Sequence, residues 1–67
     1  MAMTRVWQKG SARVEEHQFR DGTFAYSLRG RLGRPHDLDD IEEAKKVIKD
    51  WGMKEVTEEY REAGWIQ

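Results

Sequence analysis

The feature that most constrains the fold is one amphipathic helix in the second half of the chain. Apolar residues recur there at spacings of three and four, which places them on one face of an α-helix. They are Leu38, Ile41, Ala44, Val47, Ile48 and Trp51. Asp39 is positioned to cap the first turn with Glu42 three residues later, and Gly52 supplies the left-handed residue that ends a helix. The spacing predicts a helix over residues 39–51.

The first half of the chain predicts three antiparallel strands, at residues 3–9, 12–19 and 23–29. The first is rich in β-branched and aromatic residues and stops at Gly10. The other two flank Asp21-Gly22, a strong hairpin signal because glycine adopts positive φ without steric cost. We therefore expect a single α+β domain over residues 1–67: a three-stranded antiparallel sheet in the order β-β-β-α, with the amphipathic helix on one face.

The sequence is compatible with two registers of the hairpin. A two-residue loop would set Phe19 opposite Phe24, whereas a three-residue loop with a bulge would set Val14 opposite Leu28. One residue of slip exchanges the two faces of the first strand, so the choice decides which side chains meet the helix.

The tail predicts a short helical segment. Thr57 is placed to cap it and Gly64 to end it, after which Trp65 and Ile66 are expected to fold back on the body.

Composition narrows the class of protein. With 67 residues the core is thin, and we expect all seven aromatic residues to supply much of it. The absence of cysteine excludes disulfides and thiolate chemistry, and no segment has the length of a membrane span or the apolar core of a secretory signal. The expected location is the cytoplasm, with no membrane contact. His17 and His36 lack metal-ligand spacing and a catalytic set, so we expect neither an enzyme, nor a metal, nor a cofactor.

The charge distribution is the best pointer to function. Residues 1–36 hold seven basic and three acidic side chains, whereas residues 37–67 hold five basic and ten acidic ones. Such asymmetry predicts a particle with cations gathered on the uncovered sheet face and anions gathered behind it. Arg13, Arg20 and Arg29 would form a positive strip on that face, extended by Arg31 and Arg34 in the loop that follows. A strip of this kind binds nucleic acid through its phosphates.

A basic hairpin with the sequence FRDGTFAYSL, in a three-stranded sheet followed by one helix, resembles the N-terminal arm-type DNA-binding domains of tyrosine integrases. The resemblance covers about residues 3–51. It implies that the sheet lies in the major groove of DNA with the helix on the far side. By that likeness Gln18 and Thr23 join Arg13, Arg20 and Arg29 in facing DNA. The leading hypothesis is a nucleic-acid-binding module of mobile-element or phage-like type.

The acidic half supports an alternative of another class. Asp39, Asp40, Glu42 and Glu43 could present negative charge to a basic surface of a host protein. This is similar to small phage inhibitors of the anti-CRISPR and DNA-mimic kind. Either function is compatible with a monomer or with a homodimer.

Overall fold

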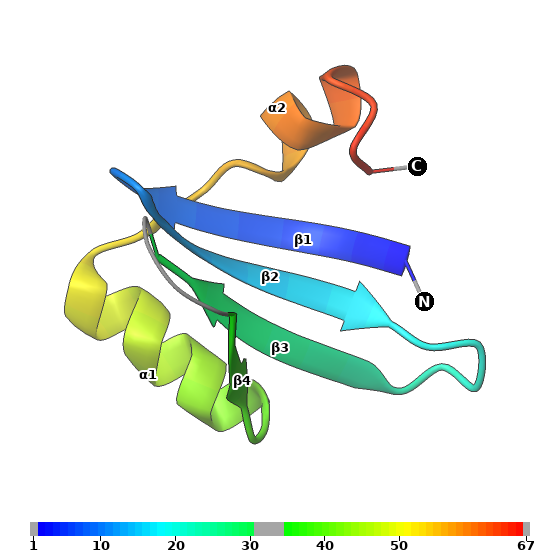
Figure 1. Ribbon diagram of the computed structural model, residues 1–67, viewed down its shortest axis with the longest axis horizontal. Helices are drawn as coiled ribbons and strands as arrows, with labels where there is room; N and C mark the ends of the chain where they lie inside the picture. Colours follow the sequence, from blue (N-terminus) through cyan, green and yellow to red (C-terminus); the bar gives the residue numbers. More distant parts are fainter. Residues whose placement is uncertain (1, 31–34, 67) are drawn as a thin grey trace.

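The computed structural model describes residues 2–30 and 35–66, which form one five-stranded antiparallel sheet and two helices. In chain order the elements are β1 (Ala2–Lys9), β2 (Ala12–Gln18), β3 (Phe24–Arg29), β4 (His36–Leu38), α1 (Ile41–Trp51), β5 (Lys54–Glu55) and α2 (Thr57–Glu62). The strands lie in the order β4-β3-β2-β1-β5. The first four of these are labelled in Figure 1. The α+β class is confirmed, but the expected three-stranded sheet is wrong.

The two additional strands lie at the edges of the sheet. In β4, Leu38 pairs with Tyr26 and is buried, so it belongs to the sheet rather than to the helical stripe. β5 pairs with Trp7 and Gln8 of β1 and thereby covers part of that strand's edge. Strands of two or three residues are too short to show a period of two, which is why the sequence did not reveal them.

The β2–β3 hairpin adopts the three-residue-loop register. Val14 pairs with Leu28, and the Phe19 amide donates to the Thr23 carbonyl at 2.8 Å to close a loop of residues 20–22. Gly22 provides the positive φ of 89° that this loop requires. The register places Val14 on one face of the sheet and Glu15 on the other.

The start of α1 differs from the prediction by one residue. The cap is Asp40, not Asp39: the Glu43 amide donates to Asp40 Oδ1 at 2.9 Å, and Glu43 Oε2 accepts from the Asp39 amide at 2.7 Å. This reciprocal capping arrangement begins later because β4 keeps the chain extended through Leu38. Gly52 ends the helix as expected, with φ 66°.

The second helix also begins differently from the prediction. Its N-cap is Val56, without a side-chain hydrogen bond, and Thr57 is buried. Thr57 Oγ1 accepts from the Val6 amide at 3.2 Å, so this hydroxyl fastens α2 to β1 instead of capping the helix. α1 packs against β3 and β4, whereas α2 packs against β1, as Figure 1 shows. Among the described residues, neither helix has the length and apolar character needed to cross a membrane.

The main core lies between α1 and the sheet. Its buried members are Val14, Tyr26, Leu38, Ala44 and Met53. The expectation that the aromatic residues fill the core is wrong in large part, since Tyr26 is the one among them that is buried. Phe19, Phe24, Trp51 and Trp65 are all exposed. At the end of the chain Ile66 is buried but Trp65 is not, so only one of the two folds back.

Candidate functional site

The sheet face opposite α1 carries the first basic group. Arg13 and Arg29 are cross-strand partners in β2 and β3, so their side chains lie together as the charge strip requires. Between them stands Glu15. Its Oε2 atom lies 2.5 Å from Arg13 Nε and 3.2 Å from Arg29 Nε, and its Oε1 atom lies 3.0 Å from His17 Nε2. We call these four residues the Glu15 cluster.

Electrostatics explain how Glu15 remains charged inside the cluster. Its side chain is only 4% exposed. Burial raises the pKa of Glu15, but the hydrogen bonds from Arg13 and His17 and the charges of both arginines outweigh burial, so the net pKa is lowered. The carboxylate therefore remains anionic at neutral pH and holds both guanidinium groups.

A second carboxylate on this face offsets the charge of the two arginines. Asp37 in β4 is the cross-strand partner of Ser27 and lines the same shallow hollow as Arg29. Two carboxylates thus accompany the two arginines, Arg13 and Arg29. The positive sheet face that the charge distribution predicts does not arise from these arginines.

The other residues proposed to contact nucleic acid lie apart from the Glu15 cluster. Gln18 and Arg20 are exposed near the hairpin loop, at the end opposite Arg29. The amide and hydroxyl of Thr23 both donate to Asp21 Oδ1, at 3.0 and 2.7 Å, which shapes the turn. Arg31 and Arg34 lie outside the described residues.

The acidic residues do not form one surface either. Asp40 accepts from the Glu43 amide in the first turn of α1, and Glu43 accepts from the Asp39 amide just before the helix. Asp39, Asp40 and Glu42 are all exposed. The acidic residues of α2 lie on the opposite face of the sheet from α1, because α2 contacts Arg13 through Tyr60 there. The negative charge of the second half is therefore divided between the two faces of the sheet.

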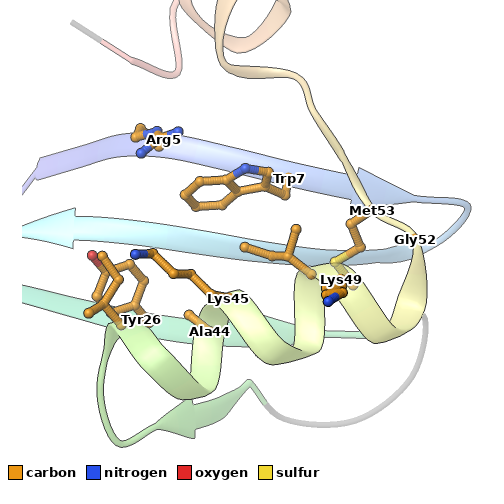
Figure 2. Close-up of a pocket in the computed structure, with 10 residues that line it drawn as sticks. Arg5, Trp7, Tyr26, Ala44, Lys45, Lys49, Gly52 and Met53 are labelled. Carbon is orange, nitrogen blue, oxygen red and sulfur yellow. The ribbon is translucent and has the colours of Figure 1, made fainter.

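A second basic group, which the sequence did not reveal, surrounds a groove on the α1 face. α1 lies over β3 and β4, but the sheet continues to β1, so side chains of β1 extend beyond the edge of the helix. The result is a cavity of about 360 Å³, which we call the α1 groove (Figure 2). Its apolar lining includes Trp7, Tyr26, Ala44, Ile48 and Met53.

Three cations line the α1 groove: Arg5 from β1, and Lys45 and Lys49 from α1. The lysines are four residues apart and so share one side of the helix, and Figure 2 shows Lys45 extending toward Tyr26. Within the described chain no carboxylate lines the groove. Glu55 accepts from Arg5 Nε and Nη2 at 3.2 and 2.9 Å and balances that charge from outside the groove. No ion pair involving either lysine is present among the described residues.

Two contacts fix the shape of the aromatic wall. The Arg5 guanidinium lies over the Trp7 ring, 4.6 Å from its centroid, in cation–π geometry. At the other side the Tyr26 hydroxyl donates to Glu16 Oε2 at 2.8 Å. Burial and this hydrogen bond raise the pKa of Tyr26 to about 12, so the phenol adds no negative charge to the groove. The lining of the groove is thus cationic and apolar.

The residues of this site are visible in the sequence, but they belong to two segments that lie far apart in the chain. Arg5 and Trp7 alternate with Val6 along a strand, and Lys45 follows Ile41 by one helical turn. Only the position of α1 over the sheet shows that these residues face one another.

No group of three or more His, Asp or Glu residues within the described ranges is arranged to hold a metal ion. In comparisons with known proteins, no family model, curated protein or solved structure matches the chain, and nothing links it to the integrase domains.

Proposed function

We propose that the protein is a non-enzymatic module that binds nucleic acid through the α1 groove. One observation carries the proposal: three cations from two separate elements line a single groove that no carboxylate of the described chain lines. Of the three, Lys45 and Lys49 make no ion pair among the described residues, whereas Arg5 is already paired with Glu55. Unpaired cations attract phosphates, and the condensed counterions that the nucleic acid then releases are the main source of affinity in nonspecific binding. The Glu15 cluster is less suited to this role because its arginines already share a carboxylate.

The groove sets the expected strength of binding. Contacts from Lys45 and Lys49 would neutralise two phosphates. For a single strand the logarithm of the binding constant falls with the logarithm of salt concentration by about 0.7 per phosphate, so a slope of roughly −1.4 is expected. Dissociation constants on the order of 10⁻⁴ to 10⁻⁶ M at physiological salt are typical of such nonspecific contacts.

A pair of charge-matched variants tests the assignment. Lys45→Ala with Lys49→Ala removes two cations from the groove, while Lys46→Ala with Lys54→Ala removes two exposed cations that do not line it. Both double variants change the net charge equally, so they have the same effect on long-range attraction. Fluorescence anisotropy with a labelled oligonucleotide over a salt series measures the affinity and the slope.

We expect the groove variant to weaken binding and to reduce the magnitude of the salt slope by about 1.4, corresponding to two lost phosphate contacts. The control variant should stay close to the parent protein. Equal losses in the two variants would place the contact elsewhere. Failure of the parent protein to bind either a single strand or a duplex at low salt would exclude the proposed function.

A further inference from the structure

We infer that the α1 groove takes one base of a single-stranded nucleic acid, stacked against Trp7, while the neighbouring phosphates contact Lys45 and Lys49. The inference rests on the proposed function and adds two things to it: the strand class and the point at which a base is held. It is carried by the wall and size of the groove rather than by its charge alone.

The wall suits a planar, uncharged group. Trp7 is partly exposed, lines the groove and has the Arg5 guanidinium against its ring (Figure 2). Bases of single strands stack on aromatic rings and on guanidinium planes, and this contact tolerates any base because every base has a π face. Arg5 is held in place by its two hydrogen bonds to Glu55, so the stacking surface is formed before a ligand arrives.

The dimensions favour a single strand over a duplex. A cavity of about 360 Å³ is at the lower end of the range for small-molecule sites, a size suited to one nucleotide. In a duplex the bases are paired and stacked on one another, so their faces cannot reach Trp7. With α1 forming one wall of the groove, a duplex could touch only the ends of the lysine side chains. A single strand can turn one base into the groove and keep both flanking phosphates at its rim.

The same groove is poorly suited to an acidic peptide. Peptides that add to a sheet bind along a strand edge, whereas the groove lies on the sheet face between α1 and β1. The Tyr26 hydroxyl already donates to Glu16, so it is not a free donor for a peptide carbonyl. What the groove offers is an aromatic plane with cations at its rim, the combination that single-strand-binding proteins use.

The fluorescence of Trp7 provides a direct test. Trp51 and Trp65 are exposed and lie outside the groove lining, so Trp51→Phe with Trp65→Phe leaves Trp7 as the only tryptophan without disturbing the core. This protein is titrated with oligothymidine, with a duplex of equal length and with polyglutamate. We expect saturable quenching of Trp7 by the single strand, little quenching by the duplex and none by polyglutamate.

A second measurement compares two tryptophan variants of the whole chain. Trp7→Leu should weaken binding of oligothymidine roughly ten- to a hundredfold, the range for loss of one stacked base, whereas Trp51→Leu should leave it within about twofold. Circular dichroism checks that both variants are folded. If Trp7→Leu does not fold, the quenching experiment decides alone.

The outcomes separate this inference from the proposed function. Binding that depends on Lys45 and Lys49 but leaves Trp7 emission unchanged, or equal quenching by the duplex, would overturn the inference and leave the function standing. Equal quenching by polyglutamate would show that the groove binds acidic peptides and would overturn both. Absence of binding by either nucleic acid would also overturn both.

Discussion

Replacing Glu15 by glutamine is the sharpest test of how the sheet is held together. The change keeps the shape of the side chain but removes the buried charge that Arg13 and Arg29 share. A hydrogen bond to a charged group contributes about 1.5–3 kcal/mol. Glu15 makes two of them, with Arg13 and His17, besides its ion pair with Arg29. Both arginine side chains are more than one-third exposed and can turn to water, which offsets part of the loss. We expect Glu15→Gln to lower the free energy of unfolding by about 2 kcal/mol.

The melting temperature gives the same expectation in another form. For a domain of this size 1 kcal/mol corresponds to about 4–8 °C, so the variant should melt roughly 8–16 °C below the parent protein. Urea unfolding followed by circular dichroism provides the free energy directly. The matched control is Glu55→Gln, which removes the carboxylate of the Arg5 pair. That pair is exposed on both sides, so the control should lose less than about 1 kcal/mol.

The pH dependence of the Glu15→Gln effect follows from the lowered pKa of Glu15. A carboxyl whose pKa falls on folding stabilises the protein fully above its unfolded value and loses this contribution as the pH falls through its folded value. The ordinary value for this group is 4.5, so the difference between parent and variant should be largest at pH 7 and should shrink below that value. Equal losses for Glu15→Gln and Glu55→Gln at pH 7, or a Glu15 effect that persists unchanged in acid, would refute the reasoning.

Three further changes test local features of the fold. Tyr26→Phe removes the hydroxyl that donates to Glu16 and should lower the free energy of unfolding by about 1–2 kcal/mol. Alkaline absorbance titration of the parent protein should show one tyrosine with a pKa of about 12, and the variant should lack that step. Gly52→Ala places a residue with a side chain at a φ of 66°, which should lower the free energy of unfolding by about 1–2 kcal/mol in urea, although the added methyl group meets no backbone atom. Asp40→Ala should cost about 1 kcal/mol and Asp39→Ala less, because only Asp40 accepts from the first turn; a larger loss at Asp39 would contradict the observed cap.

The elements that sequence reasoning found are those with a signal repeated over many residues. The helix of residues 41–51 repeats its apolar stripe over three turns, and the hairpin combines a turn pair with alternating strands. β4 and β5 offer no such repetition, and they form because β3 and β1 present free edges to them. The one-residue error at the start of α1 has a similar cause: two consecutive aspartates can both cap, and only the pairing of Leu38 in β4 decides between them.

The prediction of the core failed because it treated large apolar residues as necessarily buried. The interior of a folded protein is mostly apolar, but the reverse does not hold, because much of its surface area is apolar as well. In this fold the two most completely buried large side chains are Val6 and Val14, whose positions near the middle of neighbouring strands leave no route to water. Trp51 and Trp65 lie near the ends of helices and stay exposed.

The charge distribution misled for a related reason, since a count of charges along the chain cannot show which charges meet in the fold. Glu15 belongs to the basic half, yet it sits between two of that half's arginines and offsets them. Arg5 pairs with Glu55 across 50 residues, which joins the basic half to the acidic one. Lys45 and Lys49 belong to the acidic half, yet they line a groove to which the described residues contribute no carboxylate. A cation is available to a ligand only where the fold has not already supplied it with an anion, and by that criterion Lys45 and Lys49 of α1 are better placed than Arg13 and Arg29 to meet a phosphate.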